Sequence, residues 1–299
     1  MYDELMKTFG PRARFHEPMS VHTTFRIGGP ADVLVDVVSR DELRTVLEFA
    51  REHGVPLHVI GRGANVLVGD DGIRGIVVRL AGEFEGLRFA DAPPTASAGA
   101  GVPLGALVDE TSSRGFANFC WAAGIPGTVG GAVFGNAGSW DRSMGEFVEE
   151  VSVMTPDGKE QVLPKSTVRF EYRRAFFPLD RPIVTSVLLR LEEPGATGPP
   201  PNRLKATYLA RKRGAQPLDL PSAGSVFRNP EGHPAGDLIE RAGCKRLHVG
   251  DAVVSTKHAN FIVNTGGATA ADVMSLIAAV QKRVRTRFGV DLELELRVL

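Results

Sequence analysis

Apolar and polar positions in the N-terminal portion of the chain follow the patterns of a small α/β unit. In DELRTVLEFAREHG, residues 41–54, apolar side chains recur at helical spacing, and the final glycine is a natural helix stop. PLHVIG at 56–61 and GIVVRL at 75–80 are short apolar runs rich in β-branched residues. Such runs predict two strands.

The middle of the chain changes to a β-rich pattern, from about residue 150 to residue 193. TPDG at 155–158 predicts a hairpin turn, and PIVTSVLLRL at 182–191 predicts a long strand. The segment EEPGATGPPPN at 192–202 is rich in proline and glycine and has no periodicity. It is therefore the best candidate for a linker.

The C-terminal third combines helices with short strands. The pattern predicts a basic helix near 203–213, a second helix near 235–242, and two short strands in DAVVSTKHANFIVN at 251–264. A long amphipathic helix is predicted over TAADVMSLIAAVQKRVRTRFG at 269–289, where the first threonine and Asp272 form a capping-box-like pair. The terminal DLELELRVL alternates as a strand does.

Composition excludes several classes of protein. Apolar residues make up 43% and charged residues 23% of the 299 residues, and 35 basic side chains balance 35 acidic ones. This balance gives no electrostatic reason to expect nucleic acid or an anionic membrane as a partner. The start, MYDELMKTFG, lacks a signal-peptide pattern, and no apolar run is long enough for a membrane helix. Cys120, Cys244 and seven scattered histidines give no metal-ligand spacing, so we expect reduced thiols, no metal and a cytoplasmic protein.

Glycine gathers in three clusters: GRGANVLVG at 61–69, AGAGVPLGAL at 98–107 and GIPGTVGGAVFGNAG at 124–138. Bare backbone allows amide groups to approach a phosphate closely, but glycines also serve turns and tight packing. No cluster matches the GxGxxG fingerprint, and there is no Walker A sequence. For any one cluster packing is the better interpretation, whereas three together favour a diphosphate cofactor in a non-Rossmann cradle.

Six motifs occur in a shared order: GRGANVLV, GIPGTVGGAVFGNAG, EYRRAFF, PSAGSVFRNP, HANFIVN and LELELR. From TTFRIGG at 23–29 onward the chain resembles the UDP-N-acetylenolpyruvoylglucosamine reductases, in their compact second type. The resemblance implies an α/β (α+β) fold: a two-part FAD-binding module of the vanillyl-alcohol-oxidase type and a C-terminal α+β substrate domain. We expect FAD-binding subdomains at 1–80 and 81–197 and a substrate-binding domain at 198–290. The terminal segment 291–299 is expected to return to the first subdomain or to the active site.

The resemblance also implies a chemistry. NADPH would reduce non-covalently bound FAD and leave, and the reduced flavin would then deliver hydride to the enolpyruvyl methylene of UDP-N-acetylglucosamine enolpyruvate. The product would be UDP-N-acetylmuramate, a peptidoglycan precursor. Such a site needs a cation for the developing enolate and a proton donor for the neighbouring carbon.

Arg173 in EYRRAFF and Ser225 in PSAGSVFRNP match the family's enolate-stabilising arginine and proton donor. From the residues alone, Arg173 is an ordinary arginine, exposed or paired with Glu171, and Ser225 is a turn serine. Ser222 is the competing serine, and the Gly-Ser pair of the motif selects Ser225. The Arg-Ala-Phe that follows Arg173 departs from the small polar residue common in relatives, which puts the neighbouring contacts in doubt.

Glu295 matches the family's active-site glutamate, which would polarise the enolpyruvyl group or relay a proton. In LELELR the leucines share one face and Glu293, Glu295 and Arg297 share the other. This alternation predicts an ordinary solvated face, which can also line a wet cleft. Glu293 is the alternative if the register differs by one repeat.

The remaining site residues follow from the same motifs. For substrate we expect contacts from Tyr172, Arg213, Gly224 and Asn229, although Arg213 in ARKRG has an equally good interpretation as a solvated helix end. GNAGSWD departs from the usual family pattern at both ends, which would change contacts rather than the cofactor. The expected FAD contacts are Arg62, Gly63, Ala64, Asn65, Val66, Leu67, Gly124, Ile125, Pro126, Gly127, Thr128, Gly130, Gly131, Asn136, Ala137 and Gly138.

Two other functions compete with the reductase. An FAD-dependent oxidase or dehydrogenase of the same superfamily, acting on a small alcohol or hydroxy acid, would keep the glycine clusters but would not need Arg173, Ser225 and Glu295 together. A non-catalytic flavin- or sugar-nucleotide-binding relative would need none of them. We expect a monomer whose partners are the UDP-sugar enolpyruvyl ether and NADPH, with no nucleic acid and no membrane.

Overall fold

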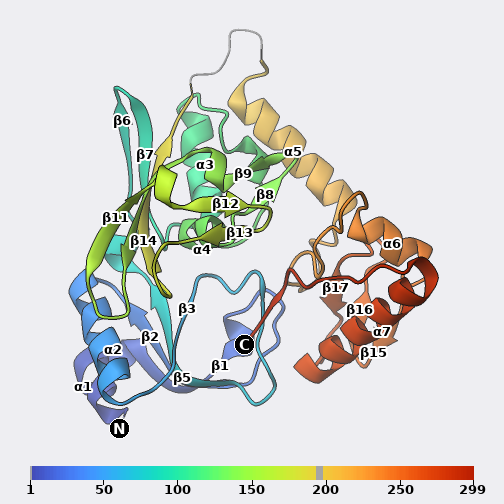
Figure 1. The fold of residues 1–299 in the computed structure, drawn as a ribbon, viewed down its shortest axis with the longest axis horizontal. Helices are drawn as coiled ribbons and strands as arrows, with labels where there is room; N and C mark the ends of the chain where they lie inside the picture. The colour runs from blue at the N-terminus through green and yellow to red at the C-terminus, as the bar shows by residue number, and fades with distance from the viewer. Residues whose placement is uncertain (1, 193–197) are drawn as a thin grey trace. The chain divides into compact units, whose positions relative to one another are not determined.

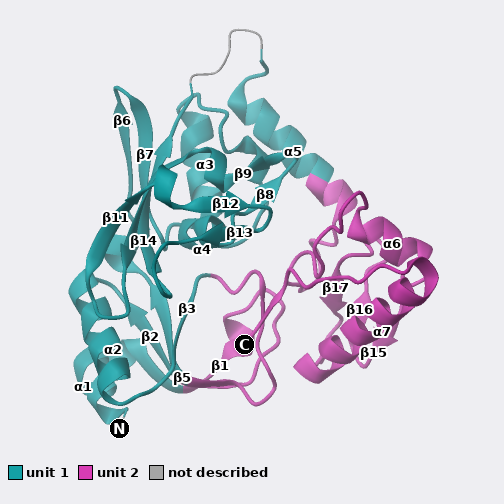
Figure 2. Ribbon diagram, in the orientation of Figure 1, with its two compact units in different colours: residues 1–15, 33–61, 75–211 teal, residues 16–32, 62–74, 212–299 magenta. Residues whose placement is uncertain are grey.

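The computed structural model of the chain describes residues 2–192 and 198–299, and these form two compact units (Figure 2). Unit 1 comprises residues 1–15, 33–61 and 75–211, and unit 2 comprises residues 16–32, 62–74 and 212–299. Each unit contains its own buried apolar core. The three-domain division expected from the resemblance stays a prediction.

The N-terminal portion of the chain forms a four-stranded sheet, ordered β1-β2-β5-β3 (Figure 1). Its members are β1 (Ala13–Pro18), β2 (Pro30–Val37), β5 (Ile73–Leu80) and β3 (Leu57–Ile60). Helix α2 (Arg40–Glu52) begins where Ser39 Oγ accepts a hydrogen bond from the Glu42 amide, and its apolar stripe is buried as the spacing predicts. The short helix α1 (Asp3–Phe9) contributes Leu5 and Phe9 to the same core.

The β-rich middle of the chain forms an antiparallel five-stranded sheet in unit 1, ordered β11-β10-β14-β7-β6. The TPDG turn joins β10 to β11, as predicted. Helices α3 (Leu104–Ser113) and α4 (Val129–Phe134) share the apolar core of this sheet (Figure 1). The five strands are β11 (Glu160–Pro164), β10 (Val148–Met154), β14 (Ile183–Arg190), β7 (Pro94–Gly99) and β6 (Leu87–Asp91).

Two small hairpins extend from this part of unit 1. One consists of β8 (Gly138–Ser139) and β9 (Arg142–Ser143), and the other of β12 (Arg169–Glu171) and β13 (Arg174–Phe176). Helix α5 (Pro201–Ala215) starts within the segment predicted as a linker, of which residues 193–197 lie outside the described residues. Short 3₁₀ helices occupy Gly10–Arg12, Met19–Val21, Gly82–Glu85, Cys120–Ala122, Met144–Glu146 and Lys165–Thr167.

Unit 2 packs two helices against a three-stranded antiparallel sheet (Figure 1). The sheet comprises β15 (His248–Val249), β16 (Ala252–Val254) and β17 (Ile262–Asn264), and the helices are α6 (Ala235–Arg241) and α7 (Ala270–Phe288). The capping box of α7 is confirmed, since Thr269 and Asp272 bond reciprocally. The carboxylate of Asp70 adds two further bonds, to the amides of Ala270 and Ala271 at 2.8 and 2.9 Å.

The strand predicted over residues 291–299 is mostly wrong. Only β18 (Arg297–Val298) forms, parallel to β4 (Val66–Leu67). The alternation itself is correct, because Leu292 and Leu296 are buried while their polar neighbours are more exposed. The backbone before β18 bonds to loops instead of a neighbouring strand, apart from an isolated bridge between Leu294 and Phe227.

Candidate functional site

Two of the three glycine-rich segments are joined by backbone hydrogen bonds in unit 1. The amide of Gly130 donates to the carbonyl of Ala100 at 2.9 Å, and the amide of Val129 donates to the carbonyl of Val102 at 2.8 Å. The segment 98–107 therefore lies alongside the first turn of α4. The clusters that the sequence separates form one local structure.

Close packing explains two of the glycines in this structure. A Cβ on Gly61 would lie 2.6 Å from Thr128 Oγ1, and a Cβ on Gly130 would lie 2.6 Å from the Cβ of Ala100. Both distances are far below van der Waals contact, so neither position accepts a larger residue without a shift. The packing interpretation therefore holds for these two positions, and the first residue of the 61–69 cluster lies against Thr128, at the start of α4.

Other positions in the 124–131 loop leave bare backbone exposed. Gly124 and Gly131 are exposed although the residues on either side of the loop are buried. Nearby, the indole N–H of Trp121 is buried and has no hydrogen-bond partner within the described parts of the chain. An exposed glycine surface and an unsatisfied buried donor both fit a ligand rich in acceptor oxygens, as the diphosphate of FAD is.

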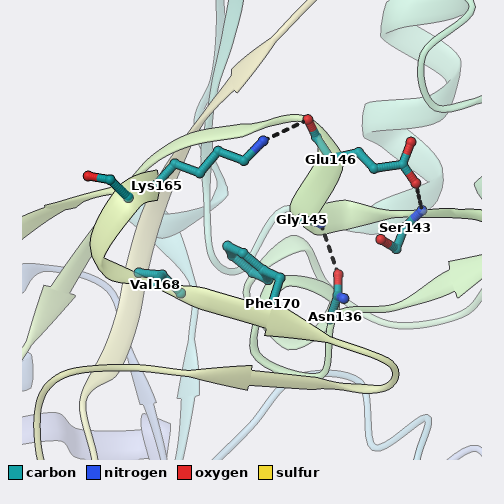
Figure 3. Close-up of a pocket in the computed structure, with 8 residues that line it drawn as sticks. Asn136, Ser143, Gly145, Glu146, Lys165, Val168 and Phe170 are labelled. Carbon is teal, nitrogen blue, oxygen red and sulfur yellow. Dashed lines mark hydrogen bonds between the residues drawn. The ribbon is translucent and has the colours of Figure 1, made fainter.

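Asn136 ties the third glycine cluster to the hairpin that carries Arg173. Its side chain is 5% exposed; Nδ2 donates to the carbonyl of Glu171 at 2.7 Å, and Oδ1 accepts from the amide of Gly145 at 2.9 Å (Figure 3). At Gly138 an added Cβ would lie 3.1 Å from Nη1 of Arg173. The GNAG segment, which the sequence suggested only as a flavin contact, therefore also positions the arginine.

Arg173 lies at the tip of the β12–β13 hairpin, in the loop closed by the pair Glu171–Arg174. Its φ of 57° places it in the left-handed region, which costs a non-glycine residue about 1–2 kcal/mol. Its guanidinium carbon lies 5.2 Å from the ring centre of Tyr172, which is 52% exposed. The carboxylate of Glu171 lies 3.3 Å from Arg169 Nε. A half-buried arginine in a strained hairpin is more typical of a functional site than of an ordinary surface.

In unit 2, Ser225 and Glu295 are brought together by the backbone between them. Ser225 forms an antiparallel bridge with Phe261, and the next carbonyl, of Val226, accepts a hydrogen bond from the Glu295 amide at 2.9 Å. Both residues are half-buried, whereas Glu293 is exposed. Although 70 positions separate them in the sequence, the backbone of Glu295 is therefore bonded to the residue that follows Ser225.

The GRGANV segment is also hydrogen-bonded to the backbone of Glu295 within unit 2. Asn65 Nδ2 donates to the carbonyl of Glu295 at 3.1 Å, and the Asn65 carbonyl accepts from the amide of Arg297 at 3.1 Å. The β4–β18 pair continues this contact. Residues 62–67, expected to bind flavin, thus lie beside the glutamate expected to act on substrate.

The candidate substrate residues differ in what their side chains do. Asn229 accepts a hydrogen bond from the Ala235 amide at 2.9 Å and so caps α6. Gly224 has a φ of 78° and open space where a Cβ would be, so its conformation rather than packing favours glycine. In the basic run of α5, Arg213 is exposed, while the neighbouring Lys212 is 4% exposed. Nothing in the sequence of α5 distinguishes Lys212 from the exposed basic residues beside it, so its burial could not be predicted.

Both cysteines are free and buried, and burial raises the pKa of the Cys120 and Cys244 thiols. Residues 2–192 and 198–299 contain no group of three or more His, Cys, Asp or Glu side chains that could hold a metal ion. No helix in those two ranges is both long and apolar enough to cross a membrane.

Two family models match the chain in succession. One, described as an FAD binding domain, matches residues 31–163, and the other, described as the C-terminal domain of UDP-N-acetylenolpyruvoylglucosamine reductase, matches residues 216–299. The mixed α/β architecture is therefore an FAD-binding module followed by this C-terminal domain.

Whole-chain relatives carry the same description. A UDP-N-acetylenolpyruvoylglucosamine reductase of Moorella thermoacetica is 45% identical over 283 residues, which are 95% of this chain and 92% of the relative. The protein of Symbiobacterium thermophilum named UDP-N-acetylenolpyruvoylglucosamine reductase 2 is 44% identical over 96% of this chain and 92% of its own length. The crystal structure of the Thermus caldophilus reductase superposes with a TM-score of 0.81, at 38% identity, over 96% of this chain and 97% of that one.

Proposed function

The chain belongs to the family of UDP-N-acetylenolpyruvoylglucosamine reductases, in its compact form of about 300 residues, and we propose that Arg173, Ser225 and Glu295 carry its reaction. It is a flavoprotein oxidoreductase of peptidoglycan precursor synthesis. The observation that carries the assignment of roles is the pairing of Ser225 with Glu295 through the carbonyl of Val226. Two chemically distinct groups, one next to Val226 in the chain and the other bonded to its carbonyl, suit a step that needs both.

The reaction is the reduction of UDP-N-acetylglucosamine enolpyruvate to UDP-N-acetylmuramate. FAD, when bound and reduced by NADPH, would supply the hydride for the enolpyruvyl methylene. Arg173 binds the substrate carboxylate and stabilises the negative charge that develops on its oxygens, a role for which a planar guanidinium suits better than an ammonium. Tyr172 lies against that guanidinium and faces solvent, where it can contact the substrate.

Ser225 delivers the proton to the carbon next to the carboxylate. A serine hydroxyl is a weak acid, so it acts only where the developing carbanion is strongly basic and a relay restores its proton. Glu295, fixed beside it through Val226 and Asn65, polarises the enolpyruvyl group or feeds that relay. Gly224, Arg213 and Asn229 bind the nucleotide-sugar portion.

We propose FAD contacts along residues 62–67, 124–131 and 136–138. Among these residues Gly124 and Gly131 are exposed, and the side chain of Asn65 donates a hydrogen bond to the carbonyl of Glu295. As the family resemblance implies, NADPH is the reductant and uses the substrate's own binding region, which would explain how a chain without a GxGxxG fingerprint can use it. We place the enzyme in the cytoplasm, where its nucleotide substrates are soluble, and we expect a monomer.

An anaerobic stopped-flow experiment tests this assignment. The purified protein is loaded with FAD, its flavin is bleached with NADPH, and the enolpyruvyl sugar nucleotide is then added without oxygen. We expect rapid reoxidation in the wild type. In Ser225→Ala reoxidation should slow by about 10²–10⁴-fold with unchanged bleaching, because general acid catalysis contributes that much.

Ser222→Ala is the matched control, since Ser222 lies in the same loop and offers its carbonyl, not its side chain, to Thr24. Equal rates in Ser225→Ala and wild type would contradict the role of Ser225. A flavin that NADPH cannot bleach, but that oxygen and a small alcohol or hydroxy acid can cycle, would instead indicate an oxidase. A protein that binds flavin but turns over neither compound would be a non-catalytic relative.

A further inference from the structure

Asn260, in the HANFIVN motif, makes three hydrogen bonds to one short segment of unit 2. Its side chain is 4% exposed; Nδ2 donates to the carbonyl of Phe227 at 2.8 Å, and Oδ1 accepts from the amide of Phe227 at 2.9 Å. Its backbone carbonyl accepts from the amide of Val226, also at 2.9 Å. These bonds fix the peptides on either side of Phe227.

The segment that Asn260 holds is the one that joins Ser225 to Glu295. Val226 donates its amide to Asn260 and offers its carbonyl to the Glu295 amide, so one residue links both partners. Ser225 bridges Phe261, the residue after Asn260. A shift of Asn260 would therefore move the serine and the glutamate together.

The backbone of Asn260 is in turn bonded to the side chain of His258. The Asn260 amide donates to Nδ1 of His258 at 3.2 Å, and the imidazole meets the ring of Phe261 edge-on, with 5.0 Å between ring centres. Burial, assisted by the charge of Lys245, lowers the pKa of His258, so the ring stays neutral and keeps its acceptor. Asn260 is thus fixed through its side chain, which bonds to Phe227, and through its amide, which bonds to His258.

We propose that Asn260 is a positioning residue that holds Ser225 and Glu295 in place for the protonation of the substrate. This inference rests on the function proposed above. An amide is required because the side chain donates to one backbone group and accepts from another, whereas a carboxylate would set an oxygen against the carbonyl of Phe227. Neither Asn260 nor His258 needs to touch substrate or flavin for this role.

The test compares Asn260→Asp with Asn264→Asp. Asn264 is also 4% exposed; its Nδ2 donates to the carbonyl of Phe25, and its Oδ1 accepts from the amides of Gly266 and Ala268. Both variants are loaded with FAD, bleached anaerobically with NADPH, and mixed with the enolpyruvyl substrate in H₂O and in D₂O. The readouts are the bleaching rate, the reoxidation rate and the solvent isotope effect on reoxidation.

We expect Asn260→Asp to slow reoxidation by about 10- to 100-fold, the loss typical of a small misplacement of a reacting group. Bleaching should be unchanged, and the solvent isotope effect should rise because proton transfer becomes slower. Asn264→Asp should keep the wild-type isotope effect. A general loss of structure would slow both half-reactions and leave the isotope effect unchanged.

Equal behaviour of the two variants, or equal loss in both half-reactions of Asn260→Asp, would overturn the inference. If Asn260→Asp does not fold, His258→Gln serves as the test variant. Selective slowing of its reoxidation, with a raised solvent isotope effect, supports the positioning role of Asn260. Wild-type kinetics in His258→Gln overturn it. A wild type that NADPH bleaches but the substrate does not reoxidise refutes the proposed function itself, before any variant is compared.

Discussion

Replacing Asn136 with alanine tests how unit 1 holds Arg173. In the wild type the Asn136 side chain joins the carbonyl of Glu171, at the base of the arginine hairpin, to the amide of Gly145. Alanine removes both hydrogen bonds and leaves both backbone groups without the partner that the fold provides. The change alters neither charge nor the hairpin's own sequence.

The loss of stability follows from the two backbone groups that lose their partner, the carbonyl of Glu171 and the amide of Gly145. A net hydrogen bond contributes about 0.5–1.5 kcal/mol, and a buried donor left unsatisfied costs about 1–3 kcal/mol. Gly145 is buried and bears the larger penalty, whereas Glu171 is exposed and water can reach its carbonyl. An open depression beside Asn136, lined also by Ser143, Lys165 and Phe170 (Figure 3), lets water offset part of the loss. We expect the free energy of unfolding to fall by about 2–3 kcal/mol.

The Asn136→Ala substitution should also alter the position of Arg173. Its left-handed backbone costs about 1–2 kcal/mol and persists only while the hairpin is held. Without Asn136 the loop can relax, so the guanidinium no longer occupies a single position beside Gly138. We therefore expect slower anaerobic reoxidation by the enolpyruvyl substrate, beyond what the loss of stability alone explains.

Urea unfolding of Asn136→Ala and Asn118→Ala measures the effect with a matched control. Asn118 is 6% exposed and accepts one hydrogen bond, from the amide of Glu192 at 3.0 Å, while its Nδ2 is buried without a partner in the described parts of the chain. Alanine there removes one bond but also an unsatisfied donor, so the loss should stay below about 1 kcal/mol. Equal losses at the two positions would refute the reasoning, as would an Asn136→Ala protein of wild-type stability.

Three further changes have definite expected outcomes. Burial raises the pKa of Asp36, but hydrogen bonds and charge from Arg79 and Arg14 outweigh it and leave the pKa lowered. The stabilisation is therefore present above the unfolded pKa and lost as pH falls through the folded one. Asp36→Asn should be about 1–2 kcal/mol less stable at pH 7, and a stability gap in urea titrations that does not shrink as the pH falls below the ordinary aspartate pKa of about 4 would contradict this. Asp70→Ala, which removes the carboxylate at the start of α7, should cost about 1 kcal/mol by thermal unfolding, and no loss would show that the capping box suffices. Gly130→Ala should destabilise unit 1 by about 1–3 kcal/mol through overpacking, and a variant that instead loses FAD at unchanged stability would assign Gly130 to the cofactor alone.

The sequence predicts most of the regular elements because their signals are local. The capping box and apolar stripe of α7 lie within one segment, as does the stripe of α2, and both helices form where expected. The terminal segment 291–299 shows the limit of such signals. Its alternation correctly separates buried Leu292 and Leu296 from exposed positions, but periodicity reports faces and not partners, and the partners here are loops.

The site is less accessible to sequence reasoning because its contacts are long-range. The amide of Asn136 bonds to a carbonyl 35 residues away, and that of Asn260 bonds to a peptide 33 residues away. Nothing in the neighbouring residues of either asparagine indicates those destinations. The family motifs mark both positions, but they do not distinguish a ligand contact from a structural one.

The three candidate catalytic residues lie on loops or hairpin turns, which leaves backbone groups near them without strand partners. A side chain that replaces a missing strand must donate to one backbone group and accept from another, and an uncharged amide does both at low desolvation cost. This requirement explains why an asparagine from a different motif bonds to the backbone near each candidate: Asn65 at Glu295, Asn136 at the Arg173 hairpin, and Asn260 behind Ser225. In this chain the motifs therefore supply a supporting asparagine near each candidate catalytic residue as well as the candidate itself, and substitution of such an asparagine should affect one half-reaction more than the other.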